Sequence, residues 1–195
     1  MFKPFPADCC ALVVEDEPAQ ALDLACMLAG LGCRVVGPAD SPREALRLLG
    51  DRRPSFVLCN ANLPARSLVP FAETLTHLEV PFAVLATGRD DPVLDRLPLL
   101  RDALRLTKPC NRGNLYRTAC ALHQVDLRSK ILATDRRISE GRVRLAQQVR
   151  LIEQLEAAGT HTALADVLLH EIGRALCIMR ASRMILCQQL ETYQR

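Results

Sequence analysis

The hydrophobic positions of the first 125 residues follow two spacings in alternation. Short apolar runs are typical of buried strands, and they span residues 11–14, 34–36, 56–59, 82–85 and 103–106. Between these runs, apolar residues recur at helical spacing and predict helices over residues 18–31, 41–50 and 71–78, with a further helix beginning near residues 111–114. Residues 91–101 are only a weak helix candidate, because Pro92 and Pro98 limit any helix there.

The strands and helices alternate at a pace that indicates one fold class. Strand–helix repeats of this length predict a parallel sheet with helices on both faces. Right-handed crossovers then favour a doubly wound α/β sandwich of five strands, similar to flavodoxin. The beginning of one helix is marked by its residue types, since Ser41 fits an N-cap, Pro42 the first helical position and Glu44 a capping box.

After Val125 the strand pattern stops, and residues 126–195 predict a helical hairpin. Gly159 fits the end of a first helix and Thr162 the N-cap of a second. The apolar residues expected to form the hairpin interface are Ile138, Leu145, Val149, Ile152 and Leu155 on the first helix, and Leu164, Leu168, Ile172, Leu176, Met179 and Leu186 on the second. Two amphipathic helices need a cover for their apolar face, so we expect homodimerisation into a four-helix bundle, docking on the first domain, or a protein partner.

The pattern leaves open how the two domains, residues 1–125 and 126–195, are joined. The last helix of the first domain runs on without a clear stop, and it is either one long rod or broken near Asp126 or Gly141. Composition agrees with a globular protein, with 49% apolar and 24% charged residues. The sequence shows no apolar run of membrane-span length and no secretory signal, so we expect a cytoplasmic protein without a membrane role.

The nine cysteines are scattered and include no CxxC pair, which favours buried thiols over a zinc site or a disulfide framework. The net charge is +3, and the excess lies in the second domain, where residues 136–150 are rich in Arg. Such a basic helix can meet phosphates, but we expect no nucleic-acid binding. The second domain contains a single aromatic residue, Tyr193, and shows no helix-turn-helix signature.

Polar residues follow the predicted strands at the edge where doubly wound sheets carry their chemistry. The sequence places Glu15 and Asp16 after the first strand, Asn60 after the third, Thr87 after the fourth and Lys108 after the fifth. The motifs Val-Val-Glu-Asp-Glu-Pro, Asn-Ala-Asn-Leu-Pro, Ala-Thr-Gly and Thr-Lys-Pro resemble the receiver domain of two-component response regulators over residues 8–125. Among these, the chain is similar to alphaproteobacterial receivers with a Phe-Ala-Thr-Gly-type motif, although Leu85 replaces the Phe. That similarity implies stress signalling.

The resemblance implies a phosphorylation site whose parts are incomplete here. In receivers an Asp attacks a phosphoryl group while an acidic pair holds Mg²⁺. Glu15, Asp16, Thr87 and Lys108 match the supporting roles, but Asn60 stands at the nucleophile position, and Arg105 where many receivers have an aromatic switch residue. The resemblance therefore implies no enzyme activity and no cofactor beyond a weakly bound Mg²⁺.

Three hypotheses of function remain from the sequence. We favour a phosphorylation-independent signalling adaptor that contacts protein partners of two-component or stress signalling. In the second, His170, in a His-Glu pair that loosely resembles the phosphoaccepting helix of histidine kinases, carries a phosphoryl group. In the third, the basic helix over residues 136–150 binds DNA or RNA.

Overall fold

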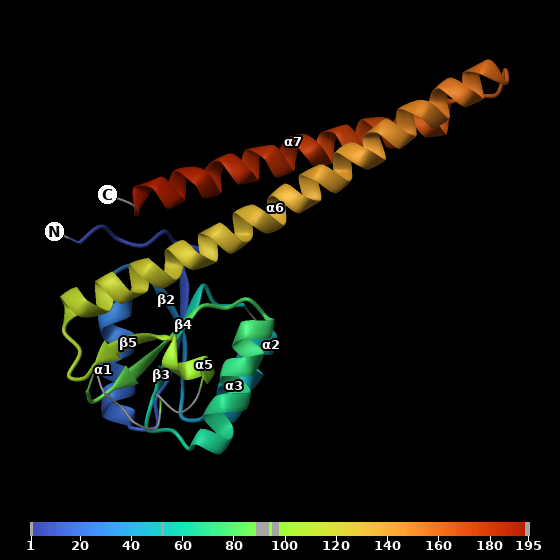
Figure 1. Cartoon of the computed structure of the whole chain (residues 1–195). Helices are drawn as coiled ribbons and strands as arrows, with labels where there is room; N and C mark the ends of the chain where they lie inside the picture. The colour runs from blue at the N-terminus through green and yellow to red at the C-terminus, as the bar shows by residue number, and fades with distance from the viewer. Residues whose placement is uncertain (1, 52, 89–93, 95–97, 194–195) are drawn as a thin grey trace. The chain divides into compact units, whose positions relative to one another are not determined.

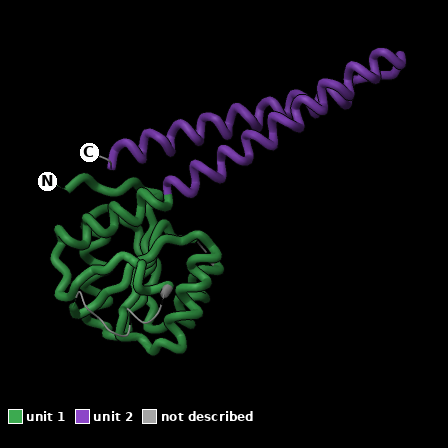
Figure 2. Tube along the Cα trace, viewed as in Figure 1, with its two compact units in different colours: residues 1–126 green, residues 127–195 purple. Residues whose placement is uncertain are grey.

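The computed structural model describes residues 2–51, 53–88, 94 and 98–193, which form two compact units over residues 1–126 and 127–195 (Figure 2). The strands are β1 (Cys10–Val14), β2 (Arg34–Ala39), β3 (Phe56–Asn60), β4 (Phe82–Ala86) and β5 (Leu104–Thr107). The helices are α1 (Pro18–Ala29), α2 (Pro42–Asp51), α3 (Ala65–His77), α5 (Pro98–Arg101), α6 (Arg112–Ala157) and α7 (Ala163–Thr192).

The first unit contains a parallel sheet with the strand order β2-β1-β3-β4-β5. Helices lie on both sides of the sheet, as Figure 1 shows for α1 on one side and α2 and α3 on the other. Every residue of the central strands β1 and β3 is buried, because both faces of these strands are covered. The prediction of a five-stranded doubly wound α/β fold is confirmed.

Helix α3 begins at Ala65, so the predicted beginning at Phe71 is wrong. Pro70 lies inside the helix, where its ring removes one backbone hydrogen bond. The helix continues through this position because it buries Leu68 and Phe71 against the sheet together with Ala72 and Leu75. Within the weak candidate at residues 91–101, Pro98 begins the short helix α5, and residues 89–93 and 95–97 lie outside the described residues.

The beginning of α2 follows the sequence prediction in one of its two parts. The backbone N–H of Glu44 donates to Ser41 Oγ at 3.3 Å, so Ser41 is the N-cap. The carboxylate of Glu44 accepts two hydrogen bonds from Arg47, at 2.9 and 2.6 Å. A capping box would require this carboxylate to reach back to the backbone N–H of Ser41. It is directed along the helix to Arg47 instead.

In the second unit, the residues of α6 and α7 form a helical hairpin. Helix α6 is continuous from Arg112 to Ala157, so it breaks at neither Asp126 nor Gly141. Gly159 ends it in the left-handed region at φ +68°, and its backbone N–H donates to Glu156 O. Thr162 precedes α7 at the expected N-cap position, but its hydroxyl makes no capping hydrogen bond. Among the described residues, we find no helix long and apolar enough to cross a membrane.

The hairpin interior contains most, but not all, of the residues expected there. Ile138, Ile152 and Leu176 are buried, and Leu145, Leu155, Ile172, Met179 and Leu186 are half-buried. The prediction that Val149, Leu164 and Leu168 lie in the hairpin interior is wrong, because these side chains are 39%, 88% and 51% exposed. The spacing of four residues on α7 explains this, because each step advances about 40° around a helix of 3.6 residues per turn. Leu164 therefore lies about 120° away from Leu176.

Two contacts fix how closely the hairpin helices pack. A Cβ atom added to Gly141 would lie 2.7 Å from Leu176 Cδ2, so this glycine allows Leu176 to pack directly against the α6 backbone. The buried amide of Gln148 donates across the hairpin to Ala165 O at 2.8 Å. The pair of helices is thus held by an apolar seam, by this cross-helix hydrogen bond, and by the ion pair of Arg183 on α7 with Asp135 on α6.

The thiols only partly match the expectation that they are buried. Cys9, Cys10, Cys33 and Cys59 are buried, whereas Cys26 and Cys177 are exposed. Cys9 Sγ and Cys33 Sγ lie 3.8 Å apart in the core, and this contact together with burial raises the pKa of Cys9. The buried thiols pack as small apolar groups.

Candidate functional site

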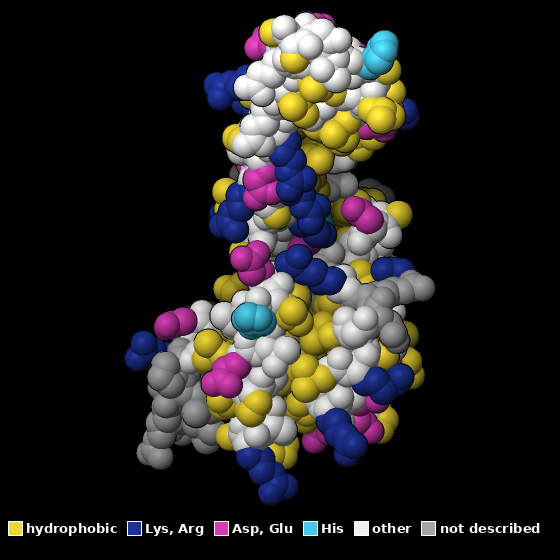
Figure 3. Space-filling view, turned by 90° about the vertical axis from the view of Figure 1, so that its right-hand side faces the viewer, with side chains coloured by type: hydrophobic (Ala, Val, Ile, Leu, Met, Phe, Trp, Pro, Cys, Tyr) yellow, Lys and Arg dark blue, Asp and Glu magenta, His cyan; other side chains and the backbone are white. Residues whose placement is uncertain are grey.

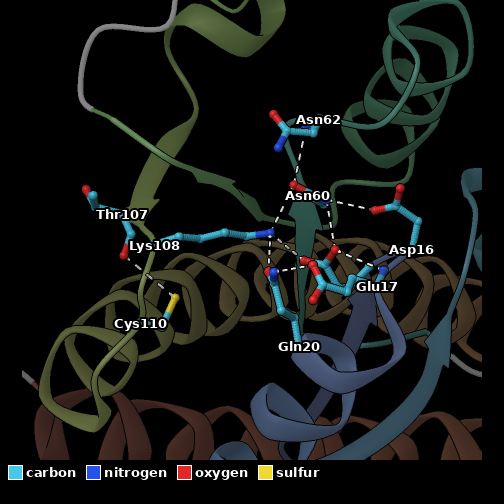
Figure 4. A network of polar contacts seen from close by, with 9 residues as sticks. Asp16, Glu17, Gln20, Asn60, Asn62, Thr107, Lys108 and Cys110 are labelled. Atoms are coloured by element: carbon cyan, nitrogen blue, oxygen red, sulfur yellow. Dashed lines mark hydrogen bonds and ion pairs between the residues drawn. The ribbon is translucent and has the colours of Figure 1, made fainter.

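The carboxyl ends of three strands bring the predicted site residues together (Figure 4). Glu15 and Asp16 follow β1, Asn60 is the last residue of β3, and Lys108 follows β5. Because β1 and β3 are neighbours in register, the acidic pair lies beside Asn60. We call Glu15, Asp16, Asn60 and Lys108 the strand-end cluster.

The side-chain amide of Asn60 lies at the centre of this cluster and is 4% exposed. Its nitrogen donates to Glu15 Oε1 and to Asp16 Oδ1, both at 2.8 Å. Its oxygen accepts from Lys108 Nζ and from the backbone N–H of Asn62, both at 3.2 Å. Two acceptors on one side and two donors on the other fix the orientation of the amide. The next backbone N–H, of Ala61, donates to Leu85 O at 2.9 Å and extends the ladder between β3 and β4.

Lys108 uses all three of its N–H groups in hydrogen bonds, two of them within the cluster. Besides Asn60, it donates to Glu15 Oε2 and to Gln20 Oε1, both at 2.7 Å. The Glu15 side chain is fully buried and that of Lys108 is 14% exposed, so this is a buried ion pair whose polar atoms are hydrogen-bonded. A buried charge of either sign requires such a partner.

Gln20 belongs to the site, although the sequence analysis did not select it. It lies in the first turn of α1, which begins at Pro18, and its amide nitrogen donates to Glu17 Oε2. The only available signal was its position one helical turn after the acidic residues, three positions beyond Glu17. In the structure, this position places Gln20 close enough to accept from Lys108.

The electrostatics of the acidic pair depend on the neutral amide. The hydrogen bond from Asn60 is the main cause that lowers the pKa of Asp16, and the charge of Lys108 acts in the same direction. Both favour the ionised carboxylate. The cluster therefore holds its carboxylates with donors supplied by the chain.

Receiver chemistry implies Mg²⁺ at the acidic pair, and the donor set does not fit that ion. Mg²⁺ requires oxygen ligands in octahedral geometry. Here Asn60 presents an NH₂ group to both carboxylates, and the Lys108 ammonium contacts Glu15. Across the described residues, no three His, Cys, Asp or Glu side chains are arranged to hold a metal ion. We therefore derive no chemistry through a metal here.

The two expected switch positions lie outside the hydrogen bonds of the cluster. Thr87 follows β4, is exposed, and shares a pocket of about 410 Å³ with Gln20 and Lys108. Arg105 lies in β5, is half-exposed, and lines another pocket of about 540 Å³. The cluster residues are thus joined by hydrogen bonds to one another, whereas Thr87 and Arg105 line two separate pockets.

The candidate residues of the second unit are exposed. His170 lies on α7 in a shallow groove that it shares with Arg174 and Cys177. The candidate nucleic-acid-binding residues of α6, which are also exposed, are Arg136, Arg137, Arg142, Arg144 and Arg150. A role for either set in phosphotransfer or nucleic-acid binding stays a prediction.

Comparison with known proteins places the first unit among receiver folds. No protein-family model matches the chain. The regulator PhyR of Methylorubrum extorquens is 36% identical over 107 residues, which are 53% of this chain and 39% of PhyR. The chain thus matches well under half the length of this curated relative.

The solved structures that resemble the chain are CheY-like receivers. The signal receiver domain of a modulated diguanylate cyclase from Desulfovibrio desulfuricans is 27% identical, covers 60% of this chain and 94% of its own, and has a TM-score of 0.54. A histidine-kinase receiver domain from Syntrophus aciditrophicus is 26% identical, over 58% and 89%, with a TM-score of 0.51. The chemotaxis protein CheY4 of Vibrio cholerae shares the fold at 22% identity, over 58% and 98%, with a TM-score of 0.52.

Proposed function

We propose that this receiver-fold chain, a homologue of a receiver-containing regulator, is a non-enzymatic signalling adaptor that works without phosphorylation and through protein contacts. One observation carries the proposal, namely the position of the Asn60 amide between Glu15, Asp16 and Lys108. We place Asn60 at the phosphoacceptor position of receivers, on the sequence resemblance and on its place at the end of β3.

The chemistry of a carboxamide supports this proposal. A phosphoacceptor needs a nucleophilic oxygen anion, and an amide oxygen carries no full charge. In Asn60 that oxygen already accepts two hydrogen bonds. The acidic pair, which would hold the metal that assists phosphoryl transfer, is occupied by N–H donors. We infer that the cluster holds the unit in one state.

The test is phosphoryl transfer from labelled acetyl phosphate in the presence of Mg²⁺. We expect no acyl phosphate on the full chain, and we expect the Asn60→Asp variant to show whether the rest of the site still supports the chemistry. Stoichiometric labelling of the wild-type chain at an acid-stable, hydroxylamine-sensitive bond would sink the proposal. Labelling of His170 instead would be acid-labile and is thus distinguishable.

The protein contacts are proposed to come from the hairpin unit. Figure 3 shows hydrophobic side chains exposed on the hairpin, at the top of the view. On α7 the exposed apolar side chains at helical spacing are Leu164, Val167, Leu168, Ile178 and Ile185, which we call the outer α7 stripe. These side chains lie on a different side of α7 from Leu176, which packs on α6. A stripe of this kind is typical of a helix that packs against another helix.

We infer that a second copy of the chain covers the outer α7 stripe in a four-helix bundle. In an antiparallel pairing of two α7 helices centred between Arg174 and Ala175, Leu164 lies opposite Ile185 of the other copy. The same pairing sets Val167 opposite Ser182, a large side chain against a small one, which suits helix packing. It also keeps the two copies of Glu171 about 10 Å apart along the axis.

Light scattering on the full chain tests this pairing. We expect a dimer for the wild type and a monomer for Ile178→Glu, which places a charge on the stripe. Gln188→Glu is the matched control, because it adds the same charge at an exposed position of α7 away from the stripe. A monomeric wild type, or equal dissociation of both variants, would contradict it.

Phosphotransfer through His170 is a second candidate function. The specific observation in its favour is the exposed position of His170 in a groove beside Arg174, which suits access by a phosphoryl donor. Labelling by a histidine kinase that disappears in His170→Ala would support it, and labelling that persists in this variant would remove it.

A further inference from the structure

Three arginines from three different elements line one pocket of the first unit. The pocket has a volume of about 540 Å³. Arg101 is the last residue of α5, Arg105 lies in β5, and Arg117 lies in the second turn of α6. The described lining is completed by Asn114, Thr118, Thr107 and Leu106, none of which is acidic.

The interactions of two of these arginines within the chain leave much of their charge available. Arg101 lies 3.4 Å from Asp102, but their side chains are 60% and 78% exposed, and such surface pairs hold little energy. Arg117 donates to the neutral side-chain oxygen of Asn114. The guanidinium groups of Arg101 and Arg117 share one pocket and repel one another, and an anion bound between them relieves this repulsion.

The donor types specify the class of ligand. The planar fork of a guanidinium matches the oxygens of phosphate or carboxylate in a bidentate way. Asn114 and Thr118 add neutral donors, and the pocket volume lies within the range of small-molecule sites. No aromatic side chain is among the described lining residues, so a stacked nucleobase finds no platform here.

We propose that this pocket, lined by Arg101, Arg105 and Arg117, binds a small oxyanion ligand that carries more than one phosphate group. It shares no residue with the strand-end cluster, so this binding is independent of the missing phosphoacceptor. Arg105, at the expected switch position, then takes the role of a ligand-binding residue. The receiver unit would sense a diffusible anion in place of its own phosphorylation.

Isothermal titration of the full chain with inorganic pyrophosphate, at fixed ionic strength and without Mg²⁺, tests the proposal. We expect one binding site, and a weakening of about tenfold or more in Arg105→Gln and in Arg117→Gln, because each loses charged hydrogen bonds. Arg43→Gln is the control, because it removes the same charge from an exposed position on α2 outside the pocket. Arg117→Lys keeps the charge without the fork, and we expect an intermediate loss.

Three results would overturn the proposal. The first is no heat with the wild type at millimolar pyrophosphate, and the second is an equal loss in Arg43→Gln, which would indicate diffuse attraction. The third is tighter binding of an acidic peptide than of pyrophosphate, which would assign the pocket to a protein partner. Circular dichroism of each variant distinguishes loss of binding from loss of fold.

Discussion

The ammonium of Lys108 donates to the buried carboxylate of Glu15 at 2.7 Å, across the ends of β5 and β1. Neither group has another opposite charge this close in the cluster, so each charge is stabilised chiefly by the other. Loss of Lys108 would leave a buried carboxylate with only neutral donors, and such broken pairs are strongly destabilising.

We therefore predict that Lys108→Met lowers the free energy of unfolding by about 3 kcal/mol, on the scale of broken buried ion pairs. Urea denaturation of the full chain measures this. The double variant Lys108→Met with Glu15→Gln removes both charges, and we expect it to recover part of the loss. If the double variant is no more stable than the single one, the ion pair is not the cause.

The hydrogen bond from Asn60 predicts a pH effect at Asp16. Because the folded pKa of Asp16 is lowered, its contribution to stability is complete above the unfolded value of about 3.9 and is lost as the pH falls through the folded pKa. Asn60→Ala removes the main cause, so we expect the pKa of Asp16 to rise. A carbon-detected NMR titration of the Asp16 carboxyl measures this directly. An unchanged pKa would mean that the hydrogen bond from Asn60 is not its main cause.

Gly141 and Gly173 form a matched pair within the hairpin. Alanine at Gly141 would place its Cβ against Leu176, whereas at Gly173 no atom lies within 4 Å. We predict that Gly173→Ala stabilises the chain by about 0.5–1 kcal/mol through helix propensity. Gly141→Ala gains the same propensity but overpacks the seam by about 1–3 kcal/mol, so we expect a net loss of about 1 kcal/mol. Denaturation followed at 222 nm compares them, and stabilisation by both would argue against the close contact.

The basic residues of α6 allow a prediction about nucleic acid. If Arg136 to Arg150 bound duplex DNA, the affinity would fall steeply with salt, since each phosphate contact releases counterions. We expect no binding to duplex DNA at 50 mM salt by fluorescence anisotropy, in line with the absence of aromatic side chains among the described residues of α6 beyond Tyr116. Salt-dependent binding that is lost in Arg142→Gln with Arg144→Gln would reverse this conclusion.

The sequence predicted the strand-end cluster because parallel strands deliver their carboxyl ends to one edge. Glu15, Asp16, Asn60 and Lys108 could therefore be selected from their places after apolar runs. The direction of the Asn60 amide was not predictable, because it depends on donors and acceptors from β1, β5 and the loop after β3. That direction is the reason why the donor set of the cluster does not fit a magnesium ion.

The helical hairpin shows where periodicity alone is insufficient. Apolar residues spaced four apart advance by about 40° around the helix at each step. Leu164 and Leu176 therefore lie on different sides of α7. The continuity of α6 past Gly141 was also undecidable from sequence, since one glycine lowers helix propensity without breaking a helix that gains a tight contact with Leu176.

The backbone hydrogen bond from Ala61 to Leu85 has a consequence for the chemical ageing of the chain. Asparagine deamidates when the backbone nitrogen of the next residue attacks the side-chain carbonyl carbon, releasing ammonia through a cyclic imide. For Asn60 that nitrogen belongs to Ala61 and is held in the ladder, while the amide itself is fixed on both sides. Conversion of Asn60 to aspartate by this route is therefore disfavoured in the folded chain.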